Sequence, residues 1–490
     1  MWKTLKRICP KLKPTLPCAK KNLRGKIISS QQDIKNLLLT EYKNRLRTRP
    51  MRDDLEDVGK RKNAIFRLKM KMSNLKRSKP WSENDLDIAL KDLKNNKSRD
   101  FEGYANEIFK NGMIGSDLKK SLLILFNSLK KENFIPQFMN HANVTTVPKK
   151  GSRLDPANER GIFRVEIIRS ILMRLIYNSK YYEIEKNMSD CQMGARKGKG
   201  CRSNIWILNG IIYENMKMSN KKPISLQFYD YKQMFDSVNL KEAINDIYDY
   251  GVQDEDLQLI YKANKEVFMA VKTAGGLTER HKITNSVLQG DTWGPMLASV
   301  QVDQIGKSVE EAGIGYFYKN ELPISILGLV DDVAGVFEAG YKAQQLNVIL
   351  NVKTSEKGLQ YGIAKCKSMV IGNKDYCINS KLLVDSWKQE YVEDKSSGEY
   401  KLVESFVGEV PIEKTNEYKY LGFIISAKGD NMANINSMKR KSIGIIRTLV
   451  QNLEDMKLKH YYFECAMDLR GTILYARETY YNLTEKTKKY

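Results

Sequence analysis

The chain has 490 residues, of which 42% are hydrophobic, and its 82 Lys or Arg against 58 Asp or Glu give a net charge of +24 at pH 7. This length and composition exclude a fully disordered protein and predict about three domains or subdomains. No run of about 18 apolar residues occurs, and the N-terminus is too charged for a signal peptide, so we expect an intracellular protein that does not span a membrane. The basic charge is typical of proteins that bind a phosphate backbone, although a solvated basic surface has the same composition.

The cysteines and histidines indicate no metal or disulfide framework. The seven cysteines contain no CxxC pair, and only three histidines occur, far apart in the chain. A structural zinc site needs four ligands, usually in close pairs. We therefore predict reduced thiols and no zinc, and nucleophilic catalysis by a Cys/His or Ser/His pair is equally unsupported.

The N-terminal segment is strongly basic. Residues 1–26 carry nine Lys or Arg and no acid, and three prolines interrupt them. Such a segment is typical of a flexible basic arm. Its basic runs are compatible with import into the nucleus, our expected location, or with electrostatic tethering alone.

Helical elements are predicted along the first half of the chain. Helical spacing begins at Gln31 with Ile34, Leu37, Leu38 and Tyr42. Ser82 and Asp85 then resemble a helix cap. Apolar spacing predicts further helices at 115–132, 163–188 and 205–216, with an extended segment at 141–151.

The second half of the chain has a different pattern. Residues 223–377 alternate strand-like and helix-like runs, as in an α+β sheet domain. Beyond about residue 385 we predict short strands with a turn at Ser397 and Gly398, followed by helices from about Asn431.

The most informative local pattern is a set of acidic residues at strand ends. Asp331 and Asp332 lie between apolar runs, and a second apolar strand ends on Asp230. An Asp pair between two strands is most often a solvated turn. Carboxylates from two strands at one point would instead bind hard divalent cations such as Mg²⁺, and two such ions about 4 Å apart can stabilise both oxygens of a phosphoryl transfer.

Several sequence blocks occur in a fixed order around these carboxylates. They are VPKKG (147–151), NERGI (158–162), MGARKGKG (193–200), YDYKQMFDSV (229–238), LQGDTWGP (288–295), LVDD (329–332), GIAKCKSM (362–369) and YLG (420–422). Together they resemble the reverse transcriptases of non-LTR (LINE-type) retrotransposons, in which the last block is the primer grip. The resemblance extends over residues of about 85 to 485, most of the chain.

The resemblance implies an α+β right-hand polymerase with an antiparallel palm sheet flanked by helices. Residues 1–80 would form the basic arm and a helical extension, and 81–222 the fingers. Residues 223–385 would form the palm, and 386–490 the primer grip and a partial thumb.

The resemblance also implies the catalytic residues. Asp230, Asp331 and Asp332 would be catalytic and hold two Mg²⁺ ions, although Asp332 has the alternative role of shaping the turn. Lys365 would be the general acid that protonates the leaving pyrophosphate.

The nucleotide-binding residues follow in the same way. Lys149, with Lys150 as its alternative, and Arg160 would contact the triphosphate. Phe235 would exclude a 2′ hydroxyl and so select dNTPs, and the carbonyl of Tyr231 would face a metal.

Further blocks would contact the nucleic acid. Gln289 and Gly290 would let the main chain approach the templating base pair, since Gly lacks a Cβ. Arg196 and Lys197 would hold template phosphates.

The implied function is extension of a DNA primer 3′ hydroxyl on an RNA template, with an RNA template and a DNA primer or RNA–DNA hybrid as partners. The sequence shows no endonuclease domain and a short C-terminal region, so a separate endonuclease is one source of the primer nick. Leu329, Met234 and Gly294 depart from the usual residues of the family but remove no metal ligand.

Three alternatives remain open. A group II intron-type reverse transcriptase shares the same core. A viral RNA-dependent RNA polymerase also has a second Asp near the first, as Asp236 is near Asp230. A truncated element that binds RNA with weak or no catalysis is the third.

Overall fold

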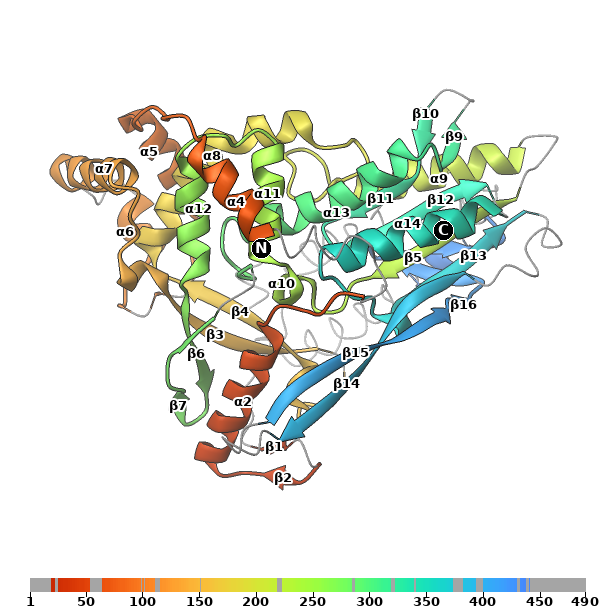
Figure 1. The fold of residues 1–490 in the computed structure, drawn as a ribbon, viewed down its shortest axis with the longest axis horizontal. Coiled ribbons are helices and arrows are strands. Elements are labelled where there is room, and N and C mark those ends of the chain that lie inside the picture. Colours follow the sequence, from red (N-terminus) through yellow and green to blue (C-terminus); the bar gives the residue numbers. More distant parts are fainter. Residues whose placement is uncertain are drawn as a thin grey trace, which may run out of the picture.

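The protein is represented by a computed structural model in which two five-stranded sheets are surrounded by helices (Figure 1). The structure describes residues 19–22, 25–52, 64–97, 99–100, 102–110, 115–149, 151–217, 223–283, 287–318, 322–338, 341–372, 382–393, 400–429, 432–437 and 440. Most of the predicted basic arm, the predicted turn at Ser397 and Gly398, and most of the predicted C-terminal helices lie outside these residues. Within them, no helix has the length and apolar character needed to cross a membrane.

The N-terminal elements are two short strands and two helices. They are β1 (Lys20–Lys21), β2 (Ile27–Ile28), α2 (Gln31–Arg45) and α4 (Ala64–Ser73). Helix α2 buries Ile34, Leu37, Leu38 and Tyr42, as predicted, because residues spaced three or four apart share one face of a helix. Lys20, from the predicted flexible arm, is instead buried in an ion pair with Glu159.

A helical region forms one end of the molecule (Figure 1). It comprises α5 (Glu83–Lys91), α6 (Asn106–Lys110), α7 (Ser116–Lys131), the 3₁₀ turn Gln137–Asn140 and α8 (Ile167–Asn187). The predicted cap is confirmed, since the Ser82 hydroxyl accepts from the Asp85 N–H and the Asp85 carboxylate accepts from the Ser82 N–H. This reciprocal pair satisfies two otherwise unpaired donors at the start of α5.

The first sheet has the order β4-β3-β6-β7, with β8 also paired to β6. Its strands are β3 (His141–Pro148), β4 (Glu159–Val165), β6 (Phe268–Thr273), β7 (Gly276–Leu277) and β8 (His281–Lys282). The helix predicted over 163–188 is wrong at its start, because Phe163–Val165 pair with Ala142–Val144 as the end of β4. Helical spacing begins only with Ile167. Over the short run before it, the apolar residues at alternate positions fit a strand as well as a helix.

The second sheet has the order β11-β12-β5-β13-β16. Its strands are β5 (Ile224–Asp230), β11 (Ile326–Leu329), β12 (Asp332–Glu338), β13 (Lys367–Ile371) and β16 (Glu413–Lys414). The first four strands are antiparallel, as predicted, and the edge strand β16 adds one parallel pair with β13.

Both faces of this second sheet are covered. Its coverings are α13 (Gly294–Glu311) and α14 (Tyr341–Glu356) on one face, and α9 (Cys201–Lys217) with the hairpin β17 (Glu417–Tyr420) and β18 (Phe423–Ser426) on the other. Strand β5 is buried along almost its whole length as a result. The polar Ser225 and Gln227 are therefore buried together with the apolar residues of the strand, as expected of a strand covered on both faces.

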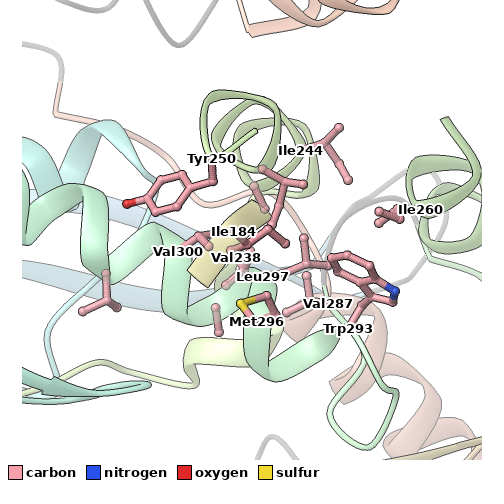
Figure 2. Close-up of a cluster of buried hydrophobic side chains, with 14 of the residues drawn as sticks. Ile184, Val238, Ile244, Tyr250, Ile260, Val287, Trp293, Met296, Leu297 and Val300 are labelled. Carbon is pink, nitrogen blue, oxygen red and sulfur yellow. The ribbon is translucent and has the colours of Figure 1, made fainter. Parts of the chain in front are cut away.

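The core on the α13 side is formed by helices that follow β5 (Figure 2). The helices are α10 (Met234–Ser237), α11 (Leu240–Asp249) and α12 (Asp256–Lys265). Figure 2 shows Trp293 and Leu297 among Val238, Ile244 and Ile260. The Trp293 side chain is fully buried. Packing against α13 therefore holds the segment after β5 in place.

Two hairpins complete the structure. They are β9 (Tyr316–Tyr318) with β10 (Leu322–Ile324), and β14 (Leu383–Glu393) with β15 (Tyr400–Pro411). The strands of the second hairpin have 11 and 12 residues, so the prediction of short strands there is wrong. Exposed and mostly half-buried residues alternate along β15, and the hairpin reaches α2, which lies beside its outer end in Figure 1.

Candidate active site

Two of the predicted carboxylates meet at neighbouring strand ends. Asp230 is the last residue of β5, Asp332 is the first of β12, and the two are direct partners in the strand register. Because side chains at paired positions lie on the same face of a sheet, both carboxylates project to one side. Asp331 directly precedes Asp332, in the two-residue turn between β11 and β12. Like charges directly opposed destabilise a sheet, so this arrangement is typical of a site that binds a cation.

The turn that carries Asp331 is strained and supported from outside. Val330 has a φ of 60°, which a β-branched residue rarely adopts. The Val330 N–H donates to Oε1 of the buried Gln192 at 3.1 Å. A Cβ at Gly194 would lie 2.4 Å from the Val330 nitrogen, so only glycine fits there. Our reasoning from sequence missed Gln192, whose position just before the Gly-rich block was the only signal.

The carboxylates of the turn are electrostatically unfavourable when all are charged. Burial, and next the charge of Asp332, raise the pKa of Asp331 to about 6. Burial, and next the charge of Asp230, raise the pKa of Asp332. Each carboxylate thus raises the cost of ionising its neighbour. A cation at this point would remove that cost.

Lys365 supplies such a cation in this structure. It ends the 3₁₀ turn Ile363–Lys365, and its Nζ lies 2.9 Å from both carboxylate oxygens of Asp230. The preceding Gly362 donates its N–H to the Asp230 carbonyl at 2.7 Å. A Cβ at Gly362 would lie 2.6 Å from Oδ2 of Asp230, so glycine is required for the carboxylate to keep this position. The structure therefore places Lys365 beside the acidic residues, which were far from it in sequence.

The donor set has the chemistry of a divalent metal site, although the side chains are not arranged around an ion. Among the described residues, no three Asp, Glu, His or Cys side chains form a cluster that could hold a metal as they stand. In this arrangement Lys365 donates to both oxygens of Asp230. Three carboxylates, two of them with raised pKa values, fit the oxygen ligands of a hard cation. Binding would require Lys365 to leave Asp230 and Asp331 to lose its proton.

The main chain of Tyr231 forms an antiparallel bridge with Tyr361, and its side chain is not part of the site. Its ring is buried and stacks on Tyr361, with 5.6 Å between ring centres. The neighbouring residues make the hydrogen bonds, with Gly362 donating to the Asp230 carbonyl and the Lys232 N–H to the Gln360 carbonyl. In such an antiparallel bridge the carbonyl of Tyr231 points away from Tyr361.

A cavity of about 610 Å³ adjoins Asp230. Lys149 lines it together with Asp230 and Lys365, and burial is the main cause that lowers the pKa of Lys149. Arg160 is exposed on β4 and does not line this cavity. The structure thus brings Lys149 but not Arg160 to the cavity, and Lys150 lies outside the described residues.

The β17–β18 hairpin, which carries the YLG block, reaches the same site. Tyr418 stacks on Phe228 with 4.1 Å between ring centres, and its hydroxyl donates to the Lys365 carbonyl at 3.2 Å. Tyr420 donates to the Leu327 carbonyl at 2.9 Å. Reasoning from sequence singled out the YLG block but missed Tyr418, which orients the backbone of Lys365.

Phe235 lies next to a glycine that departs from the family pattern. A Cβ at Gly294 would be 3.8 Å from the Phe235 ring and only 2.5 Å from the Leu288 carbonyl oxygen. The usual serine would therefore clash with the main chain at this point. Gly294 is explained by this close approach rather than by a change in chemistry.

Gln289 and Gly290 join the segment before α13 to strand β4 of the first sheet. The Gln289 carbonyl accepts from the Phe163 N–H at 2.8 Å. Gly290 has a φ of 122°, and a Cβ there would lie 2.5 Å from the Phe163 carbonyl oxygen. The backbone conformation and the contact with β4 both require glycine.

We expect Gly290→Ala to lower the free energy of unfolding by about 2–3 kcal/mol, because it combines backbone strain with a clash. Urea unfolding of the full chain measures this loss. Gly198→Ala is the matched control, since Gly198 also has a positive φ, of 76°, but has no atom within 4 Å of an added Cβ. Equal losses in the two variants would show that the contact with Phe163 is unimportant.

The prediction for Arg196 is not supported by its placement. Its guanidinium is buried and donates to Glu185 and to the carbonyls of Ser189 and Gln192. It therefore holds the Gly-rich loop together and does not face a template. Lys197 is exposed, with its ammonium 4.6 Å from the centre of the Tyr181 ring, and contact with template phosphates stays a prediction for it.

A comparison with protein families completes the description of the site. Residues 147–425 match the family described as Reverse transcriptase (RNA-dependent DNA polymerase). The match covers more than half of the 490 residues and includes every block from VPKKG to YLG.

Proposed function

The chain belongs to the reverse transcriptase family, and from this we propose that it extends a DNA primer on an RNA template with two Mg²⁺ ions held by Asp230, Asp331 and Asp332. Members of this family are RNA-directed DNA polymerases, which are nucleotidyltransferases that use divalent metal ions and dNTPs. The proposal that these three residues hold the ions is supported above all by the direct pairing of Asp332 with Asp230 beside the turn of Asp331.

The metal ligands and the lysine near them have distinct roles in this proposal. When bound, the ions would activate the primer 3′ hydroxyl and neutralise charge on the triphosphate. Asp331 would bind in its ionised form, because a cation would offset the burial and the charge of Asp332 that raise its pKa. Lys365, released from Asp230, would hold a proton at Nζ for the leaving pyrophosphate.

Nucleotide binding is assigned to residues around the cavity. Lys149, which forms no ion pair within the described part of the chain, would contact the triphosphate. Arg160 would contact the triphosphate only from outside the cavity, because it is not one of the residues that line it. The Tyr231 carbonyl would face a metal, and Gln289 and Gly290 would lie near the templating base pair.

The proposed domains follow the sheets. The sheet of β11, β12, β5 and β13 would be the palm, from residue 223, and residues 81–222 would form the fingers. Since β14 begins at Leu383, we draw the end of the palm just before this strand rather than at 385. The LINE type remains our proposal for the subfamily, supported by the order of the sequence blocks.

A polymerase that makes DNA is favoured over one that makes RNA. In a polymerase that makes RNA, Asp236 would contact the ribose of the nucleotide. Its side chain is instead buried, and burial is the main cause that raises its pKa, while the charges acting most strongly on it are Arg45 and Lys149. These surroundings support a structural role for Asp236 in stabilising α10, rather than contact with the ribose.

The function is tested by primer extension on an RNA template, with dNTPs and NTPs supplied separately. The unaltered chain should extend the primer with dNTPs and Mg²⁺. Phe235→Ala should raise the incorporation of NTPs relative to dNTPs by about tenfold or more, because removing the ring makes room for a 2′ hydroxyl.

Phe138→Ala is the matched control, since this ring is 47% exposed and lies in another part of the fold. It should keep the preference of the unaltered chain. No extension by the unaltered chain would contradict the proposed function, and preference for NTPs before any substitution would contradict the role of Phe235.

A further inference from the structure

The cavity beside Asp230 has a wall formed by parts of the chain that lie outside the sequence blocks. We call it the hairpin wall, and it consists of β14 and β15 with the segment Glu41–Arg52. The Tyr391 hydroxyl donates to Oε2 of Glu41 at 2.8 Å. Asn44 accepts from the Leu402 N–H at 3.1 Å and donates to the Tyr400 carbonyl at 3.3 Å. Figure 1 shows α2 beside the outer end of this hairpin.

A buried carboxylate connects the hairpin wall to the turn that follows Asp230. Glu404 pairs with Arg49 and accepts from the side-chain amide of Gln389. Arg49 also donates to Oε1 of Gln233 at 3.0 Å, and Gln389 accepts from the ammonium of Lys232. Gln233 has a left-handed backbone with a φ of 50°. The two residues directly after Tyr231 are therefore each bound to the hairpin wall.

Within the described part of the chain, two lysines that line the cavity form no ion pair with a carboxylate. Its charged lining residues are Glu41, Arg45, Lys149, Asp230, Lys232 and Lys365. The Arg45 guanidinium is used by Glu41 and the carbonyls of Pro156 and Glu159, and Lys365 is paired with Asp230.

Neither Lys149 nor Lys232 forms an ion pair with any described residue. The ammonium of Lys232 donates to the neutral amide oxygen of Gln389, its one hydrogen-bond acceptor among the residues that the structure describes. Both lysines are half-buried and line the same cavity. An anion with several charges would satisfy both.

We propose that Lys232 binds the polyphosphate end of the nucleotide, and the pyrophosphate released from it, and that Gln389 is the positioning residue that holds its ammonium at the cavity. The inference rests on the proposed function for the identity of the substrate. Phosphate oxygens accept strong charge-assisted hydrogen bonds from an ammonium group. The hairpin wall thereby becomes part of the nucleotide site, opposite Lys149.

Steady-state primer extension with the full chain tests this, with inorganic pyrophosphate as the second probe. Lys232→Gln should raise the KM for dNTP and the pyrophosphate concentration needed for half inhibition, each by about tenfold, with little change in kcat. Gln389→Leu should raise the same two values by a smaller factor. Lys232→Arg, which keeps the charge, should bring both values most of the way back to those of the unaltered chain.

Lys388→Gln is the matched control, because Lys388 is exposed on the same strand, pairs with Glu390 and loses the same charge. It should leave both values unchanged. A Lys232→Gln variant with an unaltered KM and unaltered pyrophosphate inhibition would overturn the proposal. So would a loss confined to kcat, which is the result of a merely structural role. If Lys232→Gln does not fold, the KM for dNTP and the pyrophosphate inhibition of Gln389→Leu take its place as the test, and unaltered values would overturn the proposal.

A binding measurement separates this inference from the proposed function. Pyrophosphate should raise the melting temperatures of the unaltered chain and of Lys388→Gln. The rise should be much smaller for Lys232→Gln. If the unaltered chain extends no primer, the proposed function fails, and this difference alone decides the inference. Equal stabilisation of all three proteins would then overturn it.

Discussion

Asp331→Asn is expected to slow primer extension by a factor of about 10³ or more while making the metal-free protein more stable. The loss of activity follows from removing a charged metal ligand, since about 4 kcal/mol of transition-state stabilisation corresponds to such a factor. The gain in stability follows from removing a carboxylate whose charge is disfavoured first by burial and then by the charges of Asp332 and Asp230. Both effects are measured on one preparation, by primer extension and by urea unfolding in EDTA.

The gain in stability should depend on pH in a defined direction. The pKa of Asp331 is about 6 in the folded protein and 3.8 as its ordinary value, so the folded state binds its proton more tightly. Ionising this group therefore costs stability as the pH rises from about 4 to above 6. The cost is about 1–2 kcal/mol after allowance for the solvent contact of this partly buried side chain. Asp331→Asn should gain this amount at pH 8 and almost nothing at pH 4.

Asp190→Asn is the control for this pair of effects. The Asp190 side chain is 95% exposed, and the substitution removes the same charge. It should change neither activity nor stability appreciably. Added Mg²⁺ should stabilise the unaltered chain more than Asp331→Asn. Equal extension by Asp331→Asn and the unaltered chain would contradict the assignment of Asp331 as a metal ligand.

Glu404→Gln should be the most destabilising single change in the hairpin wall, lowering the free energy of unfolding by about 3 kcal/mol. The Glu404 side chain is fully buried, and it pairs with Arg49 and, at 3.2 Å, with Arg47. Without its charge, the buried Arg49 guanidinium loses its carboxylate partner. The midpoint of urea unfolding measures the effect.

Glu390→Gln is its control, because Glu390 is on the same hairpin but is 54% exposed and pairs with the exposed Lys388. Its effect should stay within about 0.5 kcal/mol. A midpoint for Glu404→Gln as high as that of Glu390→Gln would show that the network around Glu404 does not hold the hairpin to the N-terminal segment.

Much of the candidate site was predictable because its signals are local. The apolar runs that end on Asp230 and precede Asp331 have the length and composition of strands, so the carboxylates were expected at strand ends. The face of α2 was predictable for the same reason, through its spacing of three and four. The order of the sequence blocks added the family, since a joint order is far more specific than any single pair of carboxylates.

The remaining features required tertiary structure, because they are contacts between segments distant in the chain. Lys365 lies 135 residues from Asp230, and the sequence contains no signal for the close packing of Gly362 that lets them pair. Gly290 and Gly294 are explained only by the carbonyls of Phe163 and Leu288 that approach them.

The sequence by itself determined the helical face of α2, the strand-end carboxylates and the family. Only the tertiary structure decided that Arg196 is a structural residue, that Phe163–Val165 belong to a strand, and that residues 41–52 meet β14 and β15 across the cavity. The physical reason is that propensity and periodicity act over a few residues. Ion pairs, close backbone approaches and cavity walls depend instead on which distant segments the folded core brings together.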